Sequence, residues 1–168
     1  MNSVRAVRLV GDRVVLREWR AEDRAVLDDL LHPERRWHDT NGPYFGRPTI
    51  DDMARAAERF IATANVPVAE RSVPRSSLAI ETQVDGQDRL VGSVSWYWEC
   101  EATDWRRLGI VLYDESVWGN GLATEALRLW VSYLFDVTDS LRLDLATYSA
   151  NSGMIAVARK LGFVEEAR

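Results

Sequence analysis

The chain has 168 residues, a hydrophobic content of 46% and a formal charge of −5, which suits a single domain over residues 1–168 with a sizeable core. The acidic balance argues against nonspecific binding to nucleic acids or anionic membranes. Cys100 is the only cysteine, so no internal disulfide can form, and no hydrophobic stretch of membrane-spanning length or leader-like start is evident, so we expect a cytoplasmic protein.

The first half of the sequence predicts a hairpin, two helices and a long loop. Strand-forming residues 7–10 and 14–18 flank the turn pair Gly11-Asp12, and residues 21–31 have apolar side chains at helical spacing. Residues 32–48 are crowded with Pro, Gly, Asn and aromatics, which is typical of a loop that carries binding function. Thr49 followed by Asp52 predicts a capped helix over about 50–64.

The second half predicts four strands and two helices. Residues 78–84, 90–98 and 108–113 read as strands, 121–135 as an amphipathic helix, 141–147 as a strand and 152–161 as a helix that stops at Gly162. A strand, a helix and a further strand in succession make 108–113 and 141–147 parallel neighbours, whereas the earlier strands, joined by short turns, are antiparallel. The predicted fold class is α/β, a mixed sheet flanked by helices.

Two glycines and an alanine occupy alternate positions, 119, 121 and 123, directly before the helix at 121–135. Bare N–H groups at a helix start bind anions, although glycines can also serve only to pack a helix closely against a strand. The segment lacks the lysine of a P-loop and the third glycine of a dinucleotide fingerprint. An anion bound here would therefore be held by neither a P-loop nor a dinucleotide-binding fingerprint.

Two separated segments carry a family resemblance. WGNGLATEA, residues 118–126, resembles the acyl-CoA pyrophosphate loop of the GNAT superfamily of N-acyltransferases, in particular the branch of ribosomal-protein N-terminal acetyltransferases. NSGMIAVARKLGF, residues 151–163, resembles the family segment in which an Asn precedes the last large helix and Lys-Leu-Gly-Phe ends it. The opening of the chain and the order of its elements are also similar, so the resemblance covers nearly the whole chain.

The resemblance implies a GNAT-like acyl-CoA N-acyltransferase fold and acetyl-CoA as co-substrate, with no metal. Backbone N–H groups of the loop would hold the pyrophosphate, and the preceding strand, splayed from its parallel neighbour, would pair with the pantetheine arm. The implied coenzyme-binding residues are Leu112, Tyr113, Trp118, Gly119, Asn120, Gly121, Leu122, Ala123, Thr124 and Asn151. The implied reaction is direct transfer of an acetyl group to a primary amine, on a protein N-terminus or a small molecule.

The residues for proton transfer are not given by the resemblance. The three positions that family members use align here with Arg107, Ala158 and Met154, none of which suits the role. Because residues two apart on a strand share a face, the catalytic candidates are Glu99, Tyr148 and Asp144, with Tyr97 beside Glu99. Each of them can also be a solvated acid or a packed aromatic, so a catalytically weak acyl-CoA-binding or regulatory module is the alternative function.

The acceptor amine is expected to meet the long loop at 32–48. Its candidate contacts are Trp37, Tyr44 and Phe45, whose aromatic side chains we expect to be exposed, and His38, which is also a candidate base. Trp96 and Trp98 are expected in the core, and Cys100 is expected to be a bystander.

The last predicted helix is followed only by VEEAR, residues 164–168, where the family has two further strands. The C-terminal strands are therefore expected to be missing or short, which leaves the strand at 141–147 with an unpaired edge. We expect either a homodimer that closes this edge or a chain cut short of its natural end.

Overall fold

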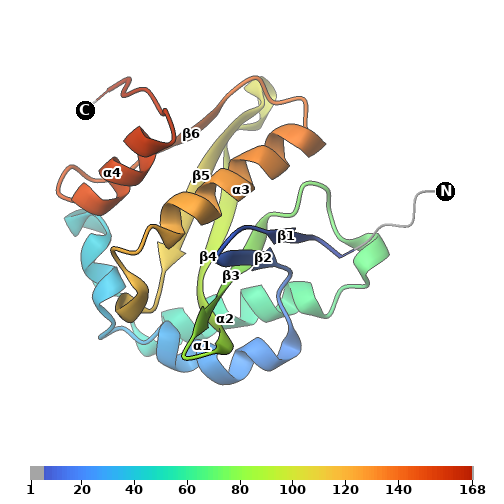
Figure 1. Ribbon diagram of the computed structural model, residues 1–168, viewed down its shortest axis with the longest axis vertical. Helices are drawn as coiled ribbons and strands as arrows, with labels where there is room; N and C mark the ends of the chain where they lie inside the picture. Colours follow the sequence, from blue (N-terminus) through green and yellow to red (C-terminus); the bar gives the residue numbers. More distant parts are fainter. Residues whose placement is uncertain (1–5, 168) are drawn as a thin grey trace.

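The computed structural model describes residues 6–167 as one six-stranded sheet with helices on both faces (Figure 1). The sheet order is β1-β2-β3-β4-β5-β6. The four pairs from β1–β2 to β4–β5 are antiparallel, and the last pair, β5–β6, is parallel. This confirms the predicted mixed sheet. The strands are β1 (Arg8–Val10), β2 (Val14–Arg17), β3 (Ser77–Val84), β4 (Gln87–Cys100), β5 (Trp105–Leu112) and β6 (Leu143–Leu145).

Two hydrophobic clusters hold the helices against the sheet. The helices are α1 (Arg24–Leu30), α2 (Ile50–Ala64), α3 (Leu122–Val137) and α4 (Ser152–Lys160). One cluster joins α3 to the sheet through side chains such as Trp130 and Leu16, and α4 packs against it. The other joins α1 and α2 to the opposite face through residues such as Leu27 and Ala57. Within residues 6–167, no helix has the length and hydrophobicity needed to cross a membrane.

Local sequence signals explain how the elements begin and turn. Thr49 accepts a hydrogen bond from the N–H of Asp52, and the Asp52 carboxylate accepts one from the N–H of Thr49, which makes the predicted capping box of α2. The hydrogen bonds from Thr49 lower the pKa of Asp52 to about 2. Between β3 and β4, Asp85 and Gly86 both have positive φ, as a two-residue hairpin turn requires.

The pairing of β5 with β6 is short. Three residues of each strand pair, from Arg106 with Leu143 to Leu108 with Leu145, and β5 then continues to Leu112 without a partner on that side in the part of the chain that the structure describes. The strand predicted at 141–147 is therefore longer than the one observed. In the same register Leu141 would face Asp104, which lies before β5 in a left-handed turn with a φ of 51°, and Leu141 is instead 98% exposed.

The long loop at 32–48 folds into two short 3-10 turns, η2 (Arg36–Thr40) and η3 (Pro43–Phe45). Tyr44 and Phe45 are 75% and 76% exposed, as expected for this loop, but Trp37 is only 8% exposed. The Trp37 indole donates to the carbonyl of Leu30 at 2.9 Å, and its ring centroid lies 5.3 Å from that of Tyr113. The expectation of an exposed Trp37 was wrong, because the short turn directs this side chain into the α1–α2 cluster.

Trp37→Ala is predicted to destabilise the fold by about 3–5 kcal/mol, since it leaves a cavity in the core and an unpaired Leu30 carbonyl. Tyr44→Ala removes an aromatic of the same loop that is three-quarters exposed, and we expect it to change stability by less than about 0.5 kcal/mol. Urea unfolding of both variants and the parent measures the difference. Equal effects of the two substitutions would contradict the buried position of Trp37.

Candidate functional site

The glycine loop, residues 118–124, joins the end of β5 to α3. Gly119 and Gly121 have φ values of 78° and 80°, a conformation that favours glycine, and Asn120 between them is exposed. A Cβ at Gly119 would meet no atom within 4 Å, so the space in front of this residue is open. The backbone of the loop is therefore accessible to a ligand.

The N-terminus of α3 has no side-chain cap. Gly121 is its N-cap residue, whereas Thr49 caps α2 and Asn151 caps α4. The first N–H groups of a helix have no partner within the helix, and the helix dipole adds partial positive charge there. This end of α3 therefore fits an anion. Leu122 offers only its backbone to a ligand, because its side chain is buried in the core.

Beside the loop, β5 presents an open edge past Leu108. The N–H of Tyr113 donates to the carbonyl of Val91 on the β4 side at 2.8 Å, so it is not free to pair with a pantetheine arm as expected. The Leu112 carbonyl accepts from the Trp118 indole at 3.0 Å. Backbone groups of alternate residues face the same side, so Ile110 shares the direction of Leu112 toward the open edge. Sequence reasoning missed Ile110 because the register was not known.

Tyr113 itself is a core residue. Its side chain is 3% exposed and its hydroxyl lies 2.6 Å from Ser93 Oγ. Burial raises the pKa of Tyr113 to about 12. The side chain supports the end of β5 from the α1–α2 side of the sheet.

Asn151 links α4 to the long loop. Its Oδ1 accepts from the N–H of Met154 at 3.0 Å, and its Nδ2 donates to the carbonyl of Thr40 at 3.2 Å. Both ends of this amide are therefore engaged within the protein. A contact with a pantetheine arm would have to replace or share one of these bonds.

Three charged residues form a cluster next to the point where β5 and β6 separate. Arg107 donates to Asp144 from Nε at 3.0 Å and from Nη2 at 2.9 Å, and its Nη1 lies 2.8 Å from Glu99. Trp105 adds a further hydrogen bond to Asp144, at 2.8 Å. The structure thus brings two of the three catalytic candidates together around Arg107, with Tyr97 opposite Arg107 in the β4–β5 register.

The two carboxylates differ in their surroundings. Burial disfavours the charged form of Asp144, but the hydrogen bonds from Arg107 and Trp105 outweigh it and lower the pKa of this carboxyl. The hydrogen bond to Asp144 likewise raises the pKa of Arg107, against its burial. The Glu99 side chain is 34% exposed against 17% for Asp144, and it has a single contact with Arg107. Glu99 is therefore the more accessible proton acceptor.

His38 and Tyr148 make contacts with residues outside this cluster. His38 is 7% exposed, stacks on Trp37 at 3.6 Å and donates from Nε2 to the carbonyl of Leu31. Burial lowers the pKa of His38, so its ring is neutral at pH 7. Tyr148 is half-buried, and its carbonyl accepts from the N–H of Asn151, so it lies beside the start of α4.

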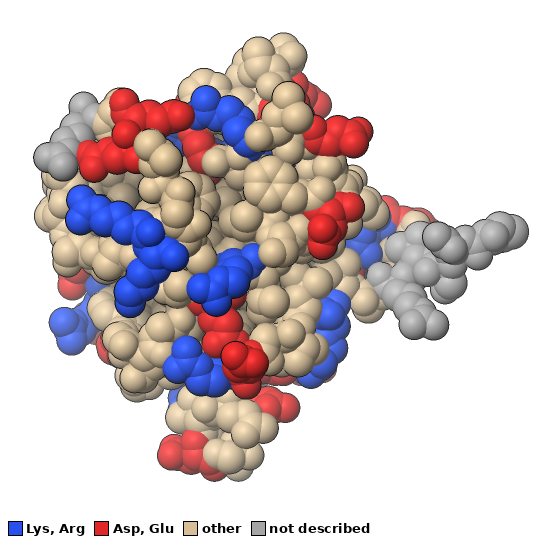
Figure 2. Space-filling view, turned by 45° about the horizontal axis from the view of Figure 1, so that its top comes forward, with Lys and Arg blue, Asp and Glu red and all other residues tan. Residues whose placement is uncertain are grey.

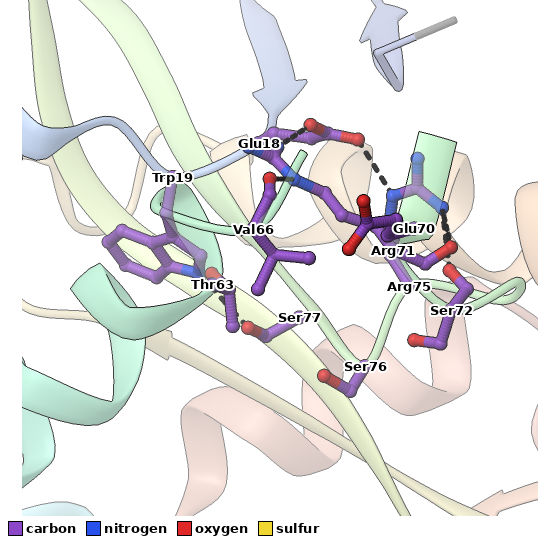
Figure 3. A pocket seen from close by; sticks show the side chains of 10 residues that line it. All are labelled: Glu18, Trp19, Thr63, Val66, Glu70, Arg71, Ser72, Arg75, Ser76 and Ser77. Carbon is purple, nitrogen blue, oxygen red and sulfur yellow. Dashed lines mark hydrogen bonds and ion pairs between the residues drawn. The ribbon is translucent and has the colours of Figure 1, made fainter. Parts of the chain in front are cut away.

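Two cavities of the protein lie outside the glycine loop. One, of about 200 Å³, has Trp19, Arg71 and Arg75 among its lining residues, with Glu18 accepting hydrogen bonds from both arginines (Figure 3). Glu18 follows β2 at the end opposite Val14, which contacts α3, so this cavity is remote from the loop. The other, of about 190 Å³, lies between α3 and the end of α4, beside Arg128 and Lys160.

On the face shown in Figure 2, basic side chains lie among acidic ones rather than in one continuous patch. Cationic groups do approach the glycine loop: the Arg36 guanidinium lies 5.9 Å from the centre of the Trp118 ring, and Arg13 donates to the carbonyl of Asn120 at 2.6 Å. Sequence reasoning missed Arg13, because 107 residues separate it from Asn120 and no local pattern signals the contact.

Comparison with known proteins gives a family and a fold. The acetyltransferase (GNAT) domain family matches residues 13–164, and a search of curated proteins found no match. A GNAT-family acetyltransferase from Bacillus anthracis is similar in structure, with a TM-score of 0.69 and 15% identity over 93% of this chain and 82% of the other. RimL, a ribosomal-protein acetyltransferase solved with coenzyme A, has a TM-score of 0.69 and 16% identity over 96% and 86% of the two chains.

A third similar structure is the microcin self-immunity acetyltransferase MccE in complex with acetyl-CoA and AMP, with a TM-score of 0.65 and 19% identity over 90% of this chain and 79% of the other. At these identities the structures show a shared fold, and the family match over residues 13–164 shows the membership. The chain belongs to the GNAT acetyltransferase family and is a transferase enzyme.

Proposed function

We propose that the protein transfers an acetyl group from acetyl-CoA directly to a primary amine, on a protein N-terminus or a small molecule. The observation that carries the proposal is the uncapped N-terminus of α3 behind two left-handed glycines, at the end of a strand with an open edge. The N–H groups of this loop fit the pyrophosphate of the coenzyme. The open backbone of Ile110 and the N–H of Leu112, whose carbonyl accepts from Trp118, fit its extended amide arm.

The charged cluster lies where the reacting groups would meet. Arg107 and Asp144 directly precede the last paired residues of β5 and β6, so the cluster borders the opening between the strands. Acetyl-CoA would supply a thioester carbonyl for attack by a neutral amine, so that a C–N bond forms and the C–S bond breaks. The departing coenzyme thiolate takes up a proton from solvent, and the amine must give up one. Glu99 accepts this proton in our proposal, and Arg107 orients Glu99 through its Nη1.

One observation favours the alternative, a catalytically weak acyl-CoA-binding module. Both candidate carboxylates are ion-paired with Arg107, and the hydrogen bonds to Asp144 lower its pKa, which makes Asp144 a weaker base. Positioning of the amine against the thioester can still lower the barrier by several kcal/mol. The two functions differ in whether binding of the coenzyme is followed by turnover.

Coenzyme binding at the loop is tested by Gly121→Glu. The substitution places a strained, negatively charged side chain at the anion site, and we expect the affinity for coenzyme A in calorimetry to fall at least about tenfold. Gly86→Glu is the matched control, because Gly86 also has a positive φ but lies in the β3–β4 turn. Equal affinities of Gly121→Glu and the control would contradict the proposed pyrophosphate site.

The variants Glu99→Gln and Asp144→Asn distinguish the roles of the two carboxylates. We expect Glu99→Gln to lower kcat by roughly a hundredfold or more, as loss of a general base does, and Asp144→Asn to affect mainly stability. Because the pKa of Asp144 is lowered in the folded state, its ion pair stabilises the fold above the unfolded pKa of about 4 and loses this effect as the pH falls further. The stability difference between the parent and Asp144→Asn therefore narrows below about pH 4 in urea unfolding. A larger loss of kcat in Asp144→Asn than in Glu99→Gln would reverse the assignment.

The exposed aromatics of the long loop are the proposed acceptor contacts. Tyr44→Ala and Phe45→Ala are expected to raise KM for the amine several-fold, since each removes apolar contact area, and to leave coenzyme A affinity unchanged. Val73→Ala, an exposed apolar residue of another loop, is the control. A change in coenzyme affinity with an unchanged KM for the amine would assign this loop to the coenzyme side.

A further inference from the structure

The β1–β2 turn packs directly against the first turn of α3. A Cβ at Gly11 would lie 2.4 Å from Glu125 Oε1, so a larger residue there would displace the Glu125 carboxylate from its present position. Glu125 Oε1 accepts hydrogen bonds from the N–H groups of Arg13 at 2.8 Å and Val14 at 3.1 Å. The start of the chain's first hairpin is thereby fixed to the helix that follows the glycine loop.

Arg13 extends this contact into the glycine loop. Its Nε lies 3.3 Å from Glu125 Oε2, and its Nη1 donates to the carbonyl of Asn120 at 2.6 Å. Its Nη2 would lie 3.3 Å from a Cβ on Gly121. The guanidinium therefore lies against the peptide that joins Asn120 to Gly121, on the side of the Asn120 carbonyl.

The geometry points to Arg13 as a positioning residue for the anion site. In a trans peptide the C=O and N–H groups point in opposite directions, so the hydrogen bond to the Asn120 carbonyl turns the N–H of Gly121 to the other side, away from Arg13. Gly121, on one side of this peptide, allows it a wide range of orientations, and Arg13 holds it in one of them. The inference rests on the proposed function, since the anion is the coenzyme's pyrophosphate.

Arg13 also compensates for a charge that would oppose the anion. The Glu125 carboxylate lies in the first turn of α3, and its side chain is 13% exposed. Burial disfavours its charged form, but hydrogen bonds from the Arg13 and Val14 backbone and the Arg13 charge outweigh this and lower its pKa, so it is ionised at neutral pH. Arg13 pairs with this negative charge at 3.3 Å. Without Arg13, an unpaired carboxylate would border the site of a bound phosphate.

The test compares three ligands in calorimetry: coenzyme A, dephospho-coenzyme A, which keeps the pyrophosphate, and pantetheine, which has no phosphate. We expect Arg13→Ala to weaken binding of coenzyme A and dephospho-coenzyme A about tenfold each, the effect of one charge-assisted hydrogen bond, and to leave pantetheine affinity unchanged. Arg13→Lys, which can still donate to the Asn120 carbonyl, is expected to recover part of the loss. Arg55→Ala is the matched control, because Arg55 is an exposed arginine that pairs with Asp52 on α2.

Three outcomes of this experiment would contradict the inference about Arg13 or the proposed function. If Arg13→Ala melts at a lower temperature but binds all three ligands like the parent, Arg13 only stabilises the hairpin and the inference is overturned. A loss confined to coenzyme A would place Arg13 at the 3′-phosphate instead, and would also overturn it. If the parent protein binds neither phosphate-containing ligand, the proposed function itself fails, which is distinct from a failure of Arg13 alone.

Discussion

The separation of β5 from β6 after three paired residues is the constraint on which the rest of the structure depends. It leaves backbone groups of Ile110 and Leu112 facing the open edge, a short turn before the glycine loop and the uncapped start of α3. Tyr113 and Trp37 support this end of β5 from one face, and the α3 cluster supports it from the other. An extended ligand with a charged end fits this combination of an open strand edge and a helix N-terminus.

Arg107 makes this candidate site different from a simple acid–base site. It stands at a position where the resemblance implied an acid, and it holds two carboxylates from neighbouring strands. The cluster combines one guanidinium with two carboxylates, and the charge of Arg142 also acts on Asp144. The Arg107 contacts fix the geometry of Glu99 beside the opening.

The sequence predicted features that depend on neighbouring residues in the chain, and it missed features that depend on tertiary packing. The Thr49–Asp52 cap and the turn at Asp85 follow from patterns within a few residues, and they are confirmed. The burial of Trp37 and His38 could not be predicted, because it depends on how two short turns pack against α1. The Arg13 contact and the direction of Ile110 depend on long-range packing and on the strand register, which no local pattern encodes.

The most direct measurement of the central claim is product formation from acetyl-CoA labelled in the acetyl group, with mass spectrometry of peptides that have free N-termini, polyamines and amino sugars. The account predicts that at least one amine gains one labelled acetyl group, with one equivalent of free thiol released and a rate that rises with pH as the amine loses its proton. Tight binding of coenzyme A without acetylation of any of these amines would contradict the catalytic assignment and favour the binding module.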